Sequence, residues 1–123
     1  MSIKVVNSAI GVFNAGEINS LDSISTNIAT LEKSDSPKIA EALCVVAESV
    51  TNNQEVSPEQ REELLDIIEE ISEQATLETD KRRKTAVIKS LLGGLAMGMG
   101  AVGSLAEVWS TWGPAILKFF GLA

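Results

Sequence analysis

The chain has 123 residues, enough for one small domain with an appended segment and too few for two full domains. Its net charge of −7, with a single short basic cluster and no aromatic side chain within it, argues against a nucleic-acid partner. Histidine and tyrosine are absent and Cys44 is the only cysteine, which excludes serine–histidine and cysteine–histidine nucleophiles and Cys/His zinc sites. We therefore expect no enzyme, no catalytic residues, no cofactor and no metal site.

Residues 1–19 carry two competing patterns. Their apolar residues partly alternate, as in a strand, and partly recur at four-residue steps, as in a short helix. Asparagine and glycine recur along the segment and favour strands and turns: Asn7, Gly11, Asn14, Gly16 and Asn19. We expect an N-terminal segment that is extended or forms a hairpin, with the helix as the alternative.

Residues 20–80 form an acidic module in which two amphipathic helices come first. Ser20 is placed to cap the first helix, which is expected to end near Ser34; its apolar stripe is Leu21, Ile24, Ile28 and Leu31. Pro37 suits the first turn of the second helix, which Asn52-Asn53 should close. The stripe of that second helix is Ile39, Leu43, Val46 and Val50. Cys44 lies among apolar neighbours and is expected to be a small buried residue.

A third helix has the strongest local signal in the chain. Ser57 can cap it, Pro58 fits its first position, and Gln60 completes a capping box. The expected buried face is Leu64, Leu65, Ile68, Ile71 and Ala75. The expected exposed face is Glu62, Glu63, Asp66, Glu69, Glu70 and Glu73. These carboxylates do not converge on one point, so a solvated face is favoured over a Ca²⁺ or Mg²⁺ site.

Residues 81–123 form a tail of opposite character. Residues 41–80 hold twelve carboxylates against one base, whereas residues 81–123 hold six bases against one carboxylate. The basic flank opens the tail: Lys81, Arg82, Arg83 and Lys84. An apolar, glycine-rich run follows from Ala86 to Ala106, about 21 residues or roughly 31 Å as one helix, close to the thickness of a hydrocarbon core. Gly113-Pro114 should bend the chain before a short terminal helix from Ala115 to Phe120.

Two destinations are open for this tail. The small residues Ser90, Gly94 and Gly98 lie four apart, which allows close helix approach in lipid or in an oligomer. Trp109 and Trp112 follow the run, where indoles favour a membrane interface. These residues are the candidate membrane or oligomer interface. However, the same stripe could pack inside a water-soluble helical core. Five glycines between 93 and 103 weaken an isolated helix by about 5 kcal/mol, so this segment needs lipid, a partner or the acidic bundle around it.

Three segments resemble a group of small bacterial proteins of acidic helices and an apolar Gly/Ala-rich tail. They are Ser72 to Thr76, Val87 to Leu92, and the Trp-Ser-Thr-Trp-Gly-Pro motif of 109–114. The resemblance implies a bacterial source and an Asn/Gly-rich beginning before acidic helices. It brings no activity and no functional residues with it.

We therefore expect a mainly α protein: a small bundle of amphipathic helices, a long apolar Gly-rich helix and a short terminal helix. The predicted function is that of a self-associating protein whose tail inserts into or lies on a membrane, specifically a toxin-like or defence-type membrane-permeabilising effector. The alternative is a soluble helical homo-oligomer or adaptor that buries the tail in its own interface. The expected location is the cytoplasmic face of a membrane, or the cytoplasm if the tail is buried. The expected partners are a second copy and membrane lipid; a protein partner is unknown.

The opposite charges of neighbouring segments suggest one further contact. The acidic face of residues 59–73 could lie against Lys81 to Lys84 and hold the apolar tail down, in part through Glu69, Glu70 and Glu73. A single exposed pair contributes only about 0–1 kcal/mol, so several would be needed to bias a closed form. The alternative is that the acidic face only keeps the protein in solution.

Overall fold

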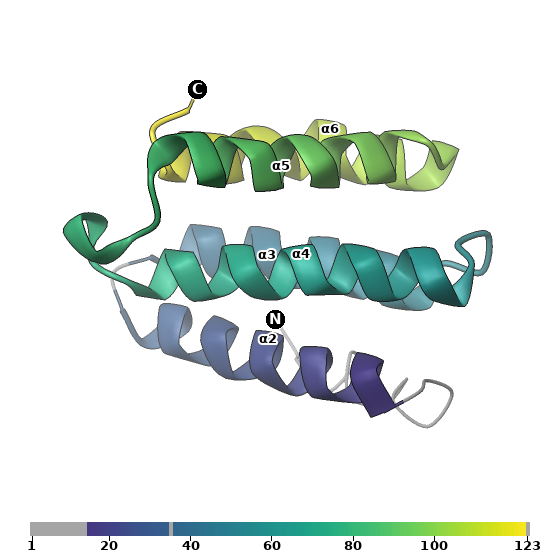
Figure 1. Ribbon diagram of the computed structural model, residues 1–123, viewed down its shortest axis with the longest axis horizontal. Helices are drawn as coiled ribbons and strands as arrows, with labels where there is room; N and C mark the ends of the chain where they lie inside the picture. The colour runs from purple at the N-terminus through teal and green to yellow at the C-terminus, as the bar shows by residue number, and fades with distance from the viewer. Residues whose placement is uncertain (1–14, 35, 123) are drawn as a thin grey trace.

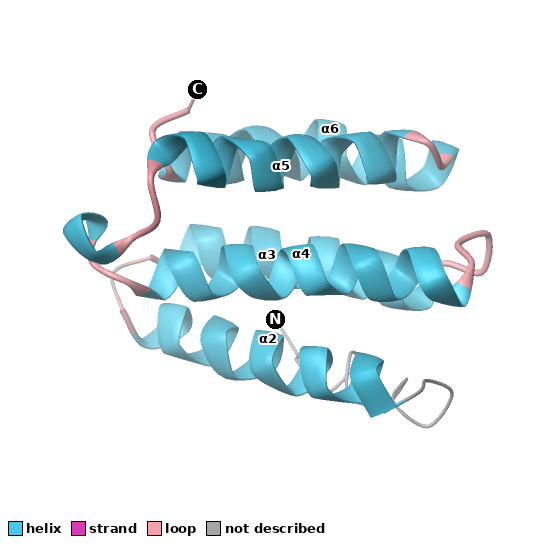
Figure 2. Cartoon of the chain, in the orientation of Figure 1, coloured by secondary structure: helices cyan, strands magenta, loops and turns pink. Residues whose placement is uncertain are grey.

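The computed structural model describes residues 15–34 and 36–122 (Figure 1). Five α-helices are found in this part of the chain: α2 (Ala15–Lys33), α3 (Pro37–Asn52), α4 (Pro58–Thr76), α5 (Thr85–Gly100) and α6 (Gly103–Phe119). A single 3-10 turn, η2 (Thr79–Lys81), lies between α4 and α5. Helices and short loops account for the described residues, with no strand among them (Figure 2). The expected mainly α bundle is confirmed.

The helices lie in three layers. α2 forms one outer layer, α3 and α4 the middle layer, and α5 with α6 the other outer layer (Figure 1). α2 contacts α3 and α4, while α5 packs on α4 and α6 packs on α3; the described residues of α2 contact neither α5 nor α6. The middle layer therefore carries apolar contacts on both sides, and α3 accordingly buries more than one narrow stripe, including Ala40, Ala42 and Ala47.

Local sequence explains where α3 and α4 begin and end. Pro37 opens α3, and Asn53 caps its end by donating its backbone N–H to the Val50 carbonyl. Ser57 accepts the Gln60 N–H at 3.1 Å, and Gln60 accepts the Ser57 N–H at 3.3 Å, which is the predicted capping box. The predicted bounds of α3 and the predicted start of α4 are confirmed to within about a residue, whereas α4 ends at Thr76, before the break expected at Thr79-Asp80.

One apolar core joins the two parts that the sequence divides near residue 80. The buried cluster runs from Leu21 in α2 through α3 and α4 to Leu92, Leu95 and Met99 in α5 and to Leu105 and Ile116 in α6. Cys44 is buried without a disulfide partner, as predicted. The predicted stripes of the first three helices are all buried. Within the acidic face of α4, however, Glu62, Glu69 and Glu70 are only partly exposed.

The start of α2 corrects the prediction for residues 1–19. α2 begins at Ala15, so residues 15–19 are helical, neither extended nor part of a hairpin, and Ser20 lies within the helix and is not its cap. Ile18 stands three residues before Leu21 and continues the apolar period, which outweighs the turn preference of Gly16 and Asn19. The prediction for residues 1–14 lies outside the described residues.

The long apolar helix is also corrected, because the run from Ala86 to Ala106 is divided between two helices. α5 ends at Gly100 and α6 begins at Gly103, with Val102 in an extended conformation between them. Because the chain turns back after Gly100, Leu95, Met99 and Leu105 all pack against the α3–α4 layer. In one straight helix, Leu105 would lie beyond the end of that layer. The two helices, called the hairpin below (residues 85–119), therefore run antiparallel (Figure 1).

The short terminal helix is likewise a correction, since α6 continues through Gly113-Pro114 to Phe119. Pro114 removes one backbone N–H from the helix and leaves the Ser110 carbonyl without its usual partner. Pro114 and Ser110 are both exposed, so water can bond that carbonyl and the helix is not forced to end there. Across residues 15–34 and 36–122, no helix combines the length and the apolar character needed to cross a bilayer.

Candidate functional site

The candidate site is the segment that attaches the hairpin to the rest of the bundle. This basic connection, residues 77–84, leaves the end of α4, makes the η2 turn and enters α5 at Thr85. It contains the whole predicted basic flank. Lys81 and Lys84 are exposed, and Lys81 lies 4.0 Å from Glu78, an exposed pair that adds little stability. The two arginines between them behave differently.

Arg82 turns back and binds the carboxyl end of α4. Its Nε donates to the carbonyls of Gln74 at 2.9 Å and Leu77 at 3.1 Å, and its Nη2 donates to the Ala75 carbonyl at 3.5 Å. The last carbonyls of a helix have no partner within the helix, and a cation at that end also meets the negative end of the helix dipole. Arg82 is therefore a side-chain cap for α4.

The same guanidinium lies over two aromatic rings at the far end of the hairpin. Its Cζ is 4.9 Å from the centroid of Phe119 and 5.2 Å from that of Phe120. The two rings meet edge to face, with centroids 5.1 Å apart. Burial lowers the pKa of Arg82 from its ordinary value, yet arginine remains charged at neutral pH. One side chain thus joins the end of α4, the basic connection and the end of α6.

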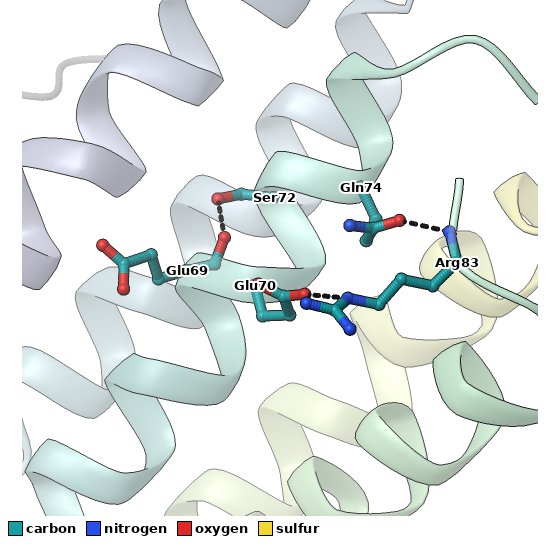
Figure 3. A network of polar contacts seen from close by, with 5 residues as sticks. All are labelled: Glu69, Glu70, Ser72, Gln74 and Arg83. Atoms are coloured by element: carbon teal, nitrogen blue, oxygen red, sulfur yellow. Dashed lines mark hydrogen bonds and ion pairs between the residues drawn. The ribbon is translucent and has the colours of Figure 1, made fainter. Parts of the chain in front are cut away.

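Arg83 provides a second attachment, drawn in Figure 3. Its backbone N–H donates to Gln74 Oε1 at 2.7 Å, and its side chain pairs with Glu70. Gln74 is 4% exposed, so this backbone bond is shielded from water, whereas the Arg83 side chain is more than half exposed. The backbone bond is therefore the more durable of the two.

Sequence analysis predicted a clasp, in which several carboxylates of residues 59–73 pair with the basic flank. In the structure one of these carboxylates, Glu70, makes such a pair. Glu70 pairs with Arg83, while Glu69 extends to the opposite side of α4 (Figure 3). Glu69 and Glu73 instead line a groove shared with Asp22 and Asn27 of α2. Asn27, which lines that groove, donates to the Ser72 hydroxyl at 2.9 Å, and Ser72 donates to the Glu69 carbonyl at 2.8 Å.

The predicted interface residues are divided between the two sides of the hairpin. Ser90 and Gly94 are exposed and Gly98 is half-buried, and a Cβ added at Gly94 or Gly98 would point toward α4. A Cβ at Gly98 would lie 2.5 Å from Leu64 Cδ2, and one at Gly94 would lie 3.7 Å from Ile67 Cδ1. Trp109 and Trp112 are partly buried against the core. The small residues of α5 therefore allow a close approach to α4 within the same chain. Contact of these residues with a membrane or with a second copy stays a prediction.

Three residues of this site were not predicted from the sequence: Gln74, Phe119 and Phe120. Gln74 stands between apolar positions of an acidic helix, and the two phenylalanines belong to what was expected to be a separate short helix. A local clue existed, since arginine shortly after a helix end can bind its last carbonyls. The stacking on Phe119 had no sequence signal, because the residues are distant along the chain.

Metal-ligand clusters and known relatives are the two remaining sources of evidence on this site. No group of three or more histidine, cysteine, aspartate or glutamate side chains in this part of the chain is arranged to hold a metal ion. No protein-family model, no curated protein and no solved structure matches the chain. The resemblance to small bacterial proteins thus stays an interpretation, and no role is transferred to any residue from a relative.

Proposed function

We propose that this is a non-enzymatic, membrane-active protein whose hairpin leaves the α3–α4 layer and lies on or inserts into a bilayer. The specific form is a toxin-like or defence-type effector that permeabilises membranes after self-association. One observation carries the proposal. The hairpin is an outer layer that packs on one neighbouring layer only, and residues 85–122 hold just three charged side chains, Lys89, Glu107 and Lys118.

The apolar face that now contacts α3 and α4 would face lipid in the open form. It includes Leu92, Leu95, Met99, Leu105 and Ile116, all at most 1% exposed. A bilayer can cover such a face as well as a protein layer can, since both remove it from water. The partly buried Trp109 and Trp112 would then lie at the level of the lipid headgroups.

Helix length favours a surface arrangement over a span. α5 has 16 residues and α6 has 17, so they are about 24 and 26 Å long, below the roughly 30 Å of a hydrocarbon core. A hairpin lying at the interface with its inner face in the acyl region needs no such length.

Vesicle binding tests this proposal. The full-length protein is mixed with phosphatidylcholine vesicles that are neutral overall, and with vesicles containing anionic lipid. Flotation, tryptophan emission and release of a trapped dye are then measured. Both tryptophans lie on α6, so the emission reports on the hairpin alone. We expect flotation, a blue shift and dye release. Protein that stays in the aqueous fraction with both lipids and releases no dye would reject the proposal.

The alternative function is a helical homo-oligomer or adaptor, and one observation favours it. Met97 on α5 is 77% exposed within a stripe of exposed small residues: Ala86, Ser90, Gly93 and Gly100. A second copy could cover this outer face, with Lys89 at its edge. Met97→Lys separates the two functions, because it changes an exposed side chain of the folded protein. It should abolish self-association in sedimentation if the outer face is the interface, and should leave surface binding to vesicles intact if the inner face meets lipid.

A further inference from the structure

Only a few polar contacts hold the hairpin to the rest of the described chain. At one end of the bundle Asn53 donates to the Ser104 hydroxyl at 2.8 Å, an exposed bond that water can replace. At the other end lies the basic connection with Arg82 and Arg83. The end of α6 is next to this connection in Figure 1, above the end of α4. The contact at the Asn53 end is therefore exposed, whereas the contact at the Arg82 end is partly buried.

We propose that Arg82 is the latch of an autoinhibited closed form, holding the end of α6 against the end of α4 until the hairpin is released. This inference rests on the proposed function for what the released hairpin does. The latch itself is a property of the folded chain without lipid.

The geometry makes Arg82 the side chain that opening must disturb. The hairpin is joined covalently to the bundle through the basic connection, so α5 and α6 can leave the middle layer only by turning about residues 77–84. Arg82 is bound to the end of α4 through the Gln74 carbonyl and to the residue just after it through the Leu77 carbonyl, and its stacking on Phe119 must break when α6 departs. The hydrogen bond from the Arg83 N–H to Gln74 Oε1 also holds the basic connection against α4.

The latch differs from a clasp of opposite charges in the partners that it uses. Arg82 contacts carbonyl oxygens and ring faces, which carry no net charge, and it is partly buried. Salt screens such contacts weakly, whereas it screens the exposed Arg83–Glu70 pair. Opening should therefore respond strongly to loss of Arg82 and weakly to moderate salt.

Hydrogen exchange of the lipid-free, full-length protein tests the latch. Arg82→Gln removes the charge and the guanidinium fork, and Lys84→Gln is the matched control, since it removes one exposed charge from the same connection. Stacking of this kind changes an equilibrium constant by a factor of about 2 to 30. We expect Arg82→Gln to speed exchange in α5 and α6 by a factor in that range while α2 is unchanged, and Lys84→Gln to have no effect.

Two results would overturn the latch: unchanged exchange in the hairpin, or equal acceleration in all helices, which would show general destabilisation. If Arg82→Gln fails to fold, Phe119→Leu with Phe120→Leu removes the rings from the other side and keeps apolar side chains at both positions. The pair should give the same hairpin-selective acceleration, and its absence overturns the latch as well.

Flotation with neutral phosphatidylcholine vesicles separates this inference from the proposed function. Faster hairpin exchange together with increased flotation of Arg82→Gln supports both. Faster hairpin exchange without flotation keeps the latch and removes the membrane function. Flotation of the wild-type protein with no effect of Arg82→Gln on exchange keeps the membrane function and removes the latch.

Discussion

Adding one methyl group at two neighbouring turns of α5 should have opposite consequences. Gly94→Ala would place its Cβ 3.7 Å from Ile67 Cδ1, an ordinary van der Waals contact. Gly98→Ala would place its Cβ 2.5 Å from Leu64 Cδ2, far inside contact distance. Leu64 is 4% exposed and packed in the core, so it must change rotamer or α5 must move away from α4.

The magnitudes follow from two terms. Replacing glycine by alanine in a helix interior gains about 1 kcal/mol in either case. At Gly94 nothing opposes this gain, so we expect about 1 kcal/mol of added stability. At Gly98 overpacking costs about 1–3 kcal/mol, which gives a net change between roughly zero and a loss of about 2 kcal/mol. The two variants should therefore differ by about 1–3 kcal/mol.

Urea unfolding followed by far-ultraviolet circular dichroism measures this difference, provided that the slope m is the same in both variants. In thermal melts of a chain of this size, each kcal/mol corresponds to about 3–5 °C. The Leu64→Ala background supplies the decisive control. With the opposing side chain shortened, Gly98→Ala should regain the full gain of about 1 kcal/mol.

Two results would refute this reasoning. The first is that Gly98→Ala stabilises the protein as much as Gly94→Ala does. The second is that the effect of Gly98→Ala is the same with and without the Leu64 side chain. Either would mean that α4 and α5 do not approach each other closely at this turn.

Two further predictions concern the bundle itself. Ile68→Asp or Ile71→Asp should unfold the protein, because each position is at most 1% exposed and an unpaired buried charge costs several kcal/mol, comparable to the stability of a small domain; a melting temperature equal to that of the wild type would show that this face is not buried. The second prediction concerns Cys44 on α3. Burial, with a smaller effect from Glu48, raises the pKa of its thiol from 9.0 to about 12. The unfolded chain therefore loses this proton at a lower pH than the folded chain, so the contribution of Cys44 to stability is complete below pH 9 and is lost between pH 9 and about 12. Cys44→Ala should flatten the pH dependence of urea unfolding over that interval, and an unchanged curve would contradict the burial of the thiol.

The sequence by itself determined the features whose causes lie within one or two helical turns. The Ser57–Gln60 capping box, Pro37 at the start of α3 and the apolar stripes of α3 and α4 are local patterns, and each lies where it was predicted. The same holds for the buried Cys44. Such signals depend on hydrogen bonds and side-chain spacing between residues close in the chain.

Only the tertiary structure decided how the tail is used. Hydropathy could not show that the run from Ala86 to Ala106 divides after Gly100, because the division is favoured by the length and position of the α3–α4 layer. Composition could not show that α6 passes through Pro114, since that depends on which side of the helix faces water. The role of Arg82 has the same origin: a basic residue before an apolar run becomes a cap and a ring contact only when packing brings the end of α4 and Phe119 to the same place.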